Sequence, residues 1–368
     1  MSKKLTSQPA SDNFRMPGEH EPQSEIWMAW PTRSDNWRHG GKPAQHAFVE
    51  VAIAISKHTP VIMLVPHSQF ANARKHLPSE ITVVEMSYND CWMRDIGATY
   101  VVNQNGERRG INWTFNAWGG LLDGLYFPWD LDNAVAEKML NLTQDDIYPT
   151  SLVLEGGSIH TDGDGTLYTT EECLLHPSRN PDLSKKQIEQ QLKMLLGVKK
   201  IIWLPRGLYN DETNGHVDNI MHVIKPAEVV LTYCEDKQDP QYQISQQAYD
   251  ILTTQTDAKG RSIKVHKLPM PGPLFMTADE AAGIDKSEGM ERQAGERLAA
   301  SYANFLISNG QVIFPLFGQP TDAVAQSILA EAFPGYTVRG VNTREIVLGG
   351  GNIHCITQQV PRVDASVE

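Results

Sequence analysis

One cysteine near the C-terminal end of the chain follows a run of three glycines, in the sequence GGGNIHCIT at residues 349–357. Glycines let other groups approach the backbone closely because they carry no side chain. Cys355 could therefore be a nucleophile in a pocket, where its thiolate needs a base or a positive charge nearby. The alternative is a packing role, because free cysteines are among the most buried residue types.

A histidine is the usual partner of a nucleophilic cysteine, and the sequence offers two candidates. The neighbouring His354 points to the opposite face if its segment is extended, which makes it a poor base for Cys355. His216 lies in DETNGHVDNIMHV, which we expect to form a strand entered through a turn at residues 214–215. In a strand, His216 and Asp218 share one face and could serve as a base and a cation-binding carboxylate. A structural histidine beside a turn-capping aspartate is the alternative.

A carboxylate ends an apolar strand in the sequence SLVLEGGS at residues 151–158. Burying Glu155 there is costly unless it is paired or functional, and the two glycines after it allow a ligand to approach. A hairpin-end glutamate that faces solvent is the alternative. The following HTDGDGT resembles a calcium loop, but its twelfth position is Cys173 instead of glutamate. We therefore predict a hairpin turn at residues 162–165.

Aromatic and acidic residues stand together in CWMRDIG, between two β-like runs. Trp92 offers a face for stacking and Asp95 offers two oxygens, a combination that suits a planar cation. The alternative places Trp92 in the core and pairs Arg94 with Asp95 at the surface. Trp118, in NAWGG, is a second aromatic candidate, for which packing is the favoured interpretation.

Cys355, His216 and the three carboxylates together indicate the charge of the substrate. Acidic groups around a thiol raise its pKa and oppose its ionisation unless the substrate itself brings a positive charge. A guanidinium group fits, because it is planar, permanently charged and has an electrophilic carbon. The net charge of −12 is compatible with a cationic substrate and argues against a nucleic-acid partner.

Five helix-then-strand units must position these residues. Apolar spacing predicts helices at residues 44–57, 132–142, 184–196, 243–254 and 321–332, and each is followed by a β-rich run. Four polar segments, three of which contain glycine, come shortly after unit strands, at residues 89–95, 154–158, 211–219 and 349–355. Radial repetition of the unit would bring all four to one centre. A doubly wound α/β sheet is the alternative arrangement.

No composition shift or linker divides the chain, so we expect one α/β domain over residues 1–368, with a flexible arm at 1–15. No apolar run approaches the roughly 18 residues of a membrane helix, and the start does not have the pattern of a signal peptide. The four scattered cysteines are expected to be free thiols. A cytoplasmic protein with no membrane partner is the expectation.

The chain resembles the agmatine deiminases, members of the guanidine-modifying pentein superfamily that are related to bacterial-type peptidylarginine deiminases. The resemblance spans nearly the whole chain and rests on WMRDIGAT (92–99), WTFNAWGG (113–120), LEGGSIHTDG (154–163), ETNGHVDN (212–219), SYANF (301–305) and GGGNIHCITQQ (349–359). It implies a five-bladed α/β propeller of ββαβ-type repeats. It also implies a hydrolase of polyamine metabolism, on the route to putrescine, that converts agmatine to N-carbamoylputrescine and ammonia without a metal or organic cofactor.

The motifs imply roles for individual residues. Cys355 matches the nucleophile and His216 the acid/base, while Glu155, Asp95 and Asp218 match the residues that hold the guanidinium. The sequence departs from the commonest family wording at Ala98, where proline is frequent, and at Glu212, where a second aspartate is common. Glu212 could bind the distal ammonium of the substrate, and Trp92 and Trp118 complete the set of candidate substrate-binding residues.

The expected chemistry is attack of the Cys355 sulfur on the guanidinium carbon, loss of ammonia with a proton from His216, and hydrolysis of the resulting thiouronium. A peptidylarginine or free-arginine deiminase would share this core. A zinc deaminase would need a CxxC motif that the chain lacks, and a non-catalytic propeller that serves as a binding platform would release no ammonia. The sequence determines neither the oligomeric state, homo-oligomer included, nor the ionisation of the free thiol, nor a biosynthetic or catabolic role.

Overall fold

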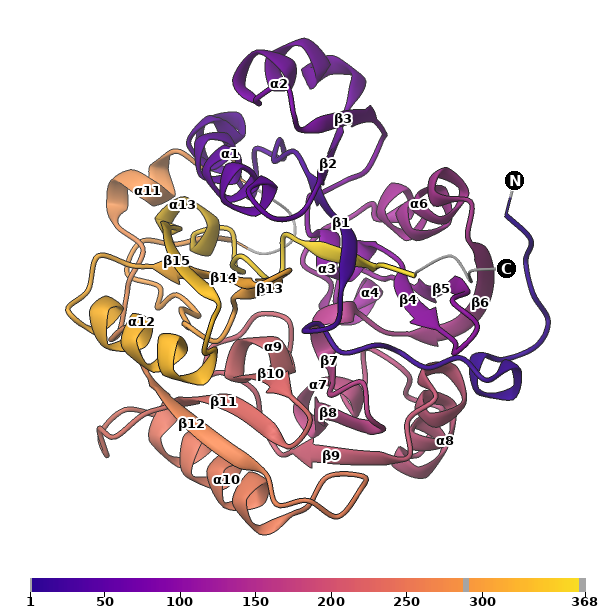
Figure 1. The fold of residues 1–368 in the computed structure, drawn as a ribbon. Coiled ribbons are helices and arrows are strands. Elements are labelled where there is room, and N and C mark those ends of the chain that lie inside the picture. The colour runs from indigo at the N-terminus through magenta and orange to yellow at the C-terminus, as the bar shows by residue number, and fades with distance from the viewer. Residues whose placement is uncertain (1, 287–290, 364–368) are drawn as a thin grey trace.

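The protein is an α/β chain of five small mixed sheets, arranged around a common centre in the computed structural model (Figure 1). The structure describes residues 2–286 and 291–363. Four of the sheets repeat one pattern, in which an antiparallel pair of strands is followed by a helix and a third strand parallel to the second. The repeated elements are β4 (Thr99–Val102), β5 (Arg108–Thr114), α6 (Val135–Thr143) and β6 (Asp146–Val153); β7 (Ile159–Thr161), β8 (Thr166–Thr170), α8 (Lys185–Leu196) and β9 (Lys200–Leu204); β10 (Met221–Lys225), β11 (Glu228–Tyr233), α10 (Gln241–Thr254) and β12 (Lys264–Pro269); β13 (Leu306–Ser308), β14 (Gln311–Leu316), α12 (Thr321–Ala332) and β15 (Thr337–Asn342).

The fifth sheet joins the two ends of the chain. Its order is β16 (Gln358–Pro361), β1 (Gln23–Ala29), β2 (Val61–Val65) and β3 (Thr82–Glu85), with α1 (Lys42–Ser56) and α2 (Phe70–His76) as the connections. The last strand runs antiparallel to the first, with Trp27 opposite Gln358. Figure 1 shows yellow β16 beside indigo β1. The segment that carries Cys355, just before β16, is thereby drawn toward the middle of the molecule.

The five predicted helices are confirmed, and local signals explain their ends. Helix α8 begins with a capping box, in which the Ser184 hydroxyl accepts from the backbone of Gln187 while the Gln187 side chain accepts from Ser184. It ends at Gly197, whose φ of 65° is left-handed and suits glycine. Helix α1 carries Pro43 in its first turn, where no backbone N–H is needed.

One predicted strand is wrong. Val217–Ile220 forms the helical turn α9, and the extended conformation begins only at Met221. The Asp211 carboxylate is the physical reason, because its Oδ2 accepts from the His216 backbone N–H at 3.0 Å and from Asn219 Nδ2 at 2.9 Å. A side chain that captures backbone donors in this way competes with the ladder of a sheet. The predicted alternation of His216 and Asp218 on a strand face therefore does not apply.

The loop that carries Cys355 is also folded instead of extended. The N–H of Ile356 donates to the Asn352 carbonyl at 3.2 Å and that of Thr357 to the His354 carbonyl at 3.1 Å. By contrast, the predicted hairpin turn at residues 162–165 is confirmed between β7 and β8. There Asp162 Oδ1 accepts from the backbone N–H groups of Asp164 and Thr166 at 2.8 and 2.9 Å.

The described part of the predicted arm, residues 2–15, lies along the body of the molecule. Leu5 donates its backbone N–H to Ile147 of β6 at 2.8 Å, and Arg15 pairs with Val102 of β4. A 3₁₀ turn at Pro9–Asp12 interrupts the segment. None of the described helices is both long and apolar enough to cross a bilayer. One domain over the whole chain stays a prediction.

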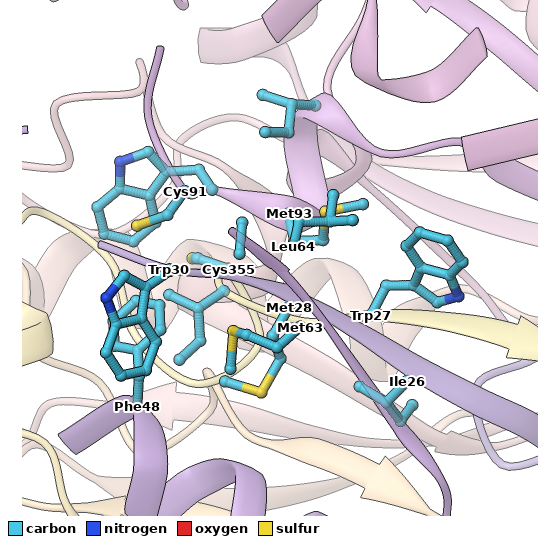
Figure 2. Close-up of a cluster of buried hydrophobic side chains, with 14 of the residues drawn as sticks. Ile26, Trp27, Met28, Trp30, Phe48, Met63, Leu64, Cys91, Met93 and Cys355 are labelled. Carbon is cyan, nitrogen blue, oxygen red and sulfur yellow. The ribbon is translucent and has the colours of Figure 1, made fainter. Parts of the chain in front are cut away.

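The chain also forms several short helices, and a large apolar cluster includes Cys355. The short helices are α3 (Met93–Ile96), α4 (Gly120–Asp123), α5 (Asp130–Asn133), α7 (Glu171–Leu174), α9, α11 (Ala278–Ala282) and α13 (Arg344–Val347). Figure 2 shows Cys355 among buried side chains that include Met28, Trp30 and Met63. Burial of such side chains stabilises by about 25 cal/mol per Å² of apolar surface. Cys355 thus packs on one side against buried apolar side chains.

Candidate active site

The four predicted polar segments meet at the centre. Arg94 of α3 donates its backbone N–H to the Cys355 carbonyl at 3.0 Å, which joins the first segment to the last. Gly157 donates its backbone N–H to Asp95 Oδ1 at 2.8 Å, which joins the first to the second. His216, at the start of α9, brings in the third through contacts with Asp95 and Glu155. The SYANF motif, immediately before β13, adds a fifth segment, since Asn304 Nδ2 lies 3.1 Å from the Cys355 sulfur.

Cys355 is 6% exposed and lies between an amide and a carboxylate. Asn304 Nδ2 donates to its sulfur at 3.1 Å, and the thiol donates toward Asp218 Oδ2 at 3.7 Å. Burial, together with the negative charges of Asp218 and Asp95, raises the pKa of Cys355 well above its ordinary value. The thiol of the free protein is therefore protonated at neutral pH, and a cation placed between the carboxylates would favour its ionisation.

Gly351 explains why the backbone beside the cysteine lacks side chains. A Cβ at this position would lie 2.5 Å from the Trp92 ring and 3.1 Å from the Cys355 sulfur. Gly350 is equally constrained, since its φ of 106° is left-handed and a Cβ there would collide with Glu212. The glycine run therefore lets Trp92, Glu212 and the thiol approach one another.

His216 lies against two carboxylates. Its Nδ1 is 3.9 Å from Asp95 Oδ2 and its Nε2 is 3.5 Å from Glu155 Oε2. Burial alone would lower the pKa of His216, but the charge of Asp95 and the contacts with Cys173 and Glu155 outweigh it, so the pKa lies well above its ordinary value. The ring is an imidazolium at neutral pH, which is the form needed to protonate a leaving amine.

Glu155 is held by a buried arginine. Arg179 donates from Nε to Oε1 of Glu155 at 2.7 Å, and neither side chain is accessible to solvent. Burial by itself would raise the pKa of Glu155, but the Arg179 charge and the contact with His216 bring it below its ordinary value. Arg179 also donates to the carbonyls of Thr213 and Trp118. The Glu155 carboxylate is thus ionised and fixed beside His216.

Asp95 accepts from both a backbone and a ring donor. Gly157 N–H lies 2.8 Å from its Oδ1, and Trp118 Nε1 lies 2.9 Å from its Oδ2. Burial, offset in part by His216, raises the pKa of Asp95 to about 6. Trp118 has a left-handed φ of 62°, which is strained for a bulky residue and turns the indole toward the carboxylate. Trp118 packs as expected, edge-on against Phe115 and Tyr126, and its indole N–H in addition binds a site carboxylate.

Gly157 is the point on which three site residues converge. A Cβ at Gly157 would lie 2.5 Å from His216 Nδ1, 3.0 Å from Asp95 Oδ1 and 3.1 Å from Asp218 Oδ2. Only a residue without a side chain fits there. The spacing of this glycine in LEGGS was the sequence signal for a close approach, and the structure shows which groups approach.

A pocket opens onto the cysteine. Its lining residues are Arg33, Asp35, Asn36, Asp90, Trp92, Asp95, Trp118, Leu125, Tyr126, Glu212, Thr213, Asn219, Arg292, Gly349, Gly350, Gly351 and Cys355. Trp92 is stacked on Trp37 at 5.2 Å between ring centroids and donates from Nε1 to Asp90 at 3.0 Å. His216, Glu155 and Asp218 lie outside this lining. His216 contacts Asp95 and Glu155, and Asp218 contacts Cys355.

Glu212, the candidate for binding the distal ammonium, lines the pocket but is already paired. Arg292 donates to both of its oxygens, at 2.8 and 3.1 Å, and also to the Gly349 carbonyl at 2.6 Å. Burial raises the pKa of Glu212, and the Arg292 charge offsets part of the effect. A substrate ammonium that approached Glu212 would therefore share it with Arg292.

Sequence reasoning missed several partners of the site. Arg179, Asn304, Arg292 and Glu19 received no role, although SYANF was recognised as a motif. The one usable signal was general: a buried Glu155 needs a cationic partner, but nothing in the sequence identifies Arg179 as that partner.

Two groups of buried side chains could offer metal ligands. The donor atoms of Glu155, Cys173 and His216 lie within 4.8 Å of one another, as do those of Glu19, His160, His222 and His354. In the first group, Arg179 and the His216 imidazolium already neutralise Glu155, which disfavours a cation. In the second, Arg94 Nη2 lies 4.0 Å from Glu19. In both groups a metal ion would therefore meet positive charge that is already present.

Comparison with known proteins identifies the family. A family model described as Porphyromonas-type peptidyl-arginine deiminase matches residues 15–361. The chain belongs to this family. A Photobacterium profundum protein provisionally named an agmatine deiminase is 64% identical, over 99% of this chain and 100% of the relative. The solved agmatine deiminase of Enterococcus faecalis is 52% identical with a TM-score of 0.96, over 98% of this chain and 100% of that one. A provisionally named arginine deiminase from Porphyromonas gingivalis is 30% identical with a TM-score of 0.82, over 95% and 98%.

Proposed function

We propose that the protein hydrolyses agmatine to N-carbamoylputrescine and ammonia, with Cys355 as the nucleophile. The observation that carries the proposal is the buried Cys355 thiol beside Asp218 and Asp95, at the inner end of a pocket. Such a thiol gains reactivity when a cation binds. The similarity to the Enterococcus faecalis enzyme over nearly the full length supports agmatine as the substrate.

The fold belongs to the same proposal. Five sheets, four of which repeat one strand order, support a five-bladed propeller of ββαβ units, as in penteins. In such an arrangement each unit delivers the segment after its last strand to the centre, which agrees with the contacts of Asp95, Gly157, His216 and Cys355.

The first half-reaction begins with the charge of the substrate. The guanidinium enters beside Asp95 and Asp218 and lowers the pKa of Cys355, so that the thiol releases its proton to solvent water. The thiolate sulfur then bonds to the guanidinium carbon and gives a neutral tetrahedral adduct. The His216 imidazolium donates its proton to one amino group, ammonia leaves, and a positively charged S-alkylthiouronium remains on Cys355. The imidazole is now neutral.

The second half-reaction returns the enzyme to its starting state. Neutral His216 takes a proton from water as the water oxygen bonds to the thiouronium carbon. The carbon–sulfur bond then breaks, the carbamoyl product leaves, and the hydroxyl proton neutralises the departing thiolate. One histidine that acts in both steps contributes roughly 10²–10⁴-fold in rate. Glu155, fixed by Arg179, holds His216 in position for both.

A peptidylarginine or free-arginine deiminase is the second candidate, and the description of the family model is the observation that favours it. A peptide chain needs an open cleft, whereas Cys355 is only 6% exposed and Arg292 and Glu212 bond across the pocket lining. The smaller agmatine fits this geometry better. Location in the cytoplasm and self-association stay part of the proposal as open predictions.

Mass spectrometry of an acid-quenched reaction tests the nucleophile and the substrate together. Agmatine, free arginine and a blocked arginine peptide are each mixed with the protein, and ammonia release is followed in parallel. We expect turnover and a covalent adduct on the Cys355 peptide with agmatine alone, and neither in Cys355→Ser. Preference for either form of arginine, or ammonia release by Cys355→Ser, would overturn the proposal.

A further inference from the structure

His354 links the site carboxylate Asp218 to a second buried carboxylate. Its Nδ1 lies 2.7 Å from Asp218 Oδ2, and its Nε2 lies 2.8 Å from Glu19 Oε2. All three side chains are at most 2% exposed. Glu19 belongs to the segment before β1, and its other oxygen accepts from the Ile307 backbone N–H at 2.7 Å. A continuous chain of contacts therefore runs from the thiol through Asp218 and His354 to Glu19.

The geometry fixes the charge of His354. Ionised carboxylates only accept hydrogen bonds, so short contacts from both ring nitrogens to Asp218 and Glu19 require an N–H on each nitrogen. A ring with two N–H groups is an imidazolium. Moreover, the same oxygen, Asp218 Oδ2, accepts from His354 and from the Cys355 thiol at 3.7 Å. A change at His354 is therefore transmitted to the oxygen beside the nucleophile.

Other charged and titratable groups also surround His354, and those that lower its pKa do so by less than the two carboxylates raise it. Arg94 donates from Nε to the His354 carbonyl at 3.3 Å, and the rings of His160 and His222 lie 5.5 and 5.0 Å away between centroids. Burial lowers the pKa of both His160 and His222, which are neutral. For His354, burial and Arg94 lower the pKa, but Glu19 and Asp218 outweigh them and the pKa is raised.

We propose that His354, clamped by Glu19, is a positioning residue that keeps the Asp218 carboxylate ionised and in place beside Cys355. It acts through Asp218 and does not touch the substrate. The inference rests on the proposed function of Cys355 and extends it to the opposite side of Asp218. Consistent with this role, burial would raise the pKa of Asp218, but the hydrogen bond from His354 lowers it below its ordinary value.

Two substitutions at one position separate the two contacts. The amide nitrogen of His354→Asn stands near the place of Nδ1 and keeps a donor for Asp218, whereas that of His354→Gln reaches toward Glu19 and leaves Asp218 without one. We expect kcat/KM for agmatine to fall on the order of 10²-fold in H354Q, while H354N recovers most of it. Equal losses in the two variants would contradict the proposal.

The pH dependence distinguishes positioning from a merely structural role. Without its donor the pKa of Asp218 rises, so H354Q should lose more activity at pH 6 than at pH 8. A loss of the same size at both values would point to general structural damage and overturn the inference. His160→Gln is the matched control, because it changes the same buried cluster but not the contact with Asp218, and its pH 6 to pH 8 ratio should equal that of the parent.

Glu19→Gln supplies a second test that does not depend on the folding of H354Q. With one anion removed, His354 loses its proton at a lower pH, so activity should decline earlier on the alkaline side than in the parent. An unchanged alkaline limb would refute the role of Glu19. Absence of agmatine turnover in the parent itself would instead refute the proposed function, so the two failures are distinguishable.

Discussion

Arg179 and Glu155 form a salt bridge of 2.7 Å from which solvent is fully excluded, and His216 lies 3.5 Å from the second oxygen of the same glutamate. The pair holds Glu155 in place, and Glu155 in turn positions His216, the proposed acid/base. It also joins the segment after β6 to the loop before α8, since Arg179 lies between α7 and α8.

Removal of Arg179 should therefore cost both stability and activity. Arg179→Met leaves Glu155 buried without its partner, a situation that typically costs about 3–5 kcal/mol. We expect the free energy of unfolding in urea to fall by that amount and kcat to fall with it, because Glu155 then gains a proton and releases His216. A variant as stable as the parent would show that the Glu155 charge is compensated elsewhere.

The ionised Asp95 carboxylate should lower the stability of the folded protein, although the proposed reaction needs it. Its pKa is about 6 in the folded state against an ordinary value of 3.8, so the folded protein binds more protons than the unfolded chain between these values. Stability contributed by this group is present below pH 4 and is lost as the pH rises to about 6. Asp95→Asn should therefore be more stable than the parent above pH 6, by about 1–3 kcal/mol, and inactive.

Thermal unfolding of the parent and Asp95→Asn at pH 4.5 and 7.5 measures the effect. The difference in stability should grow toward pH 7.5. A variant that is less stable than the parent at the higher pH would show that the hydrogen bonds from Gly157 and Trp118 outweigh the desolvation of the charge.

Asp218 should suppress the reactivity of the free thiol. Its negative charge is the largest electrostatic contribution, after burial, that raises the pKa of Cys355. Asp218→Asn should increase the rate of alkylation by iodoacetamide at pH 7.5, by about tenfold for each unit by which the pKa falls. The modified residue is located by peptide mapping, with buried Cys91, Cys173 and Cys234 as internal references. A slower reaction in the variant would remove the argument for activation by the substrate cation.

Gly157 should tolerate no side chain. A methyl group there would lie within 3.1 Å of His216, Asp95 and Asp218. Displacement of catalytic groups by about 1 Å can cost on the order of 10²-fold in rate, which is the loss we expect for Gly157→Ala. Gly260→Ala is the control: its φ of 79° makes alanine strained, but no atom lies within 4 Å of the added carbon. It should lower the melting temperature while kcat stays unchanged.

Local sequence signals predicted the elements that repeat. The Ser184 cap, the Gly197 stop and the apolar periodicity of residues 321–332 act within one turn of a helix, and the structure agrees with them. The stretch around His216 failed because Asp211 captures the backbone N–H of a residue five positions away, which propensity does not register. A turn of α9 then replaces the start of the expected strand.

The residues of the site likewise fall into those that local sequence signals could predict and those that they could not. Cys355, His216, Glu155, Asp95 and Asp218 stand in motifs that signal chemistry, and the structure brings them together. Their supporting partners come from distant positions: Glu19 is 335 residues from His354, and Asn304 is 51 residues from Cys355. No periodicity or turn chemistry connects such pairs, so only the closed arrangement of the five sheets reveals them.

The pairing of β16 with β1 also makes the Cys355 loop depend on a distant part of the chain. The loop leads directly into β16, and β16 is anchored on β1, which lies at the opposite end of the order of elements. A chain truncated before Cys355 has neither the nucleophile nor the strand that covers the open edge of β1. We therefore expect such a truncated chain to be unreactive toward guanidines.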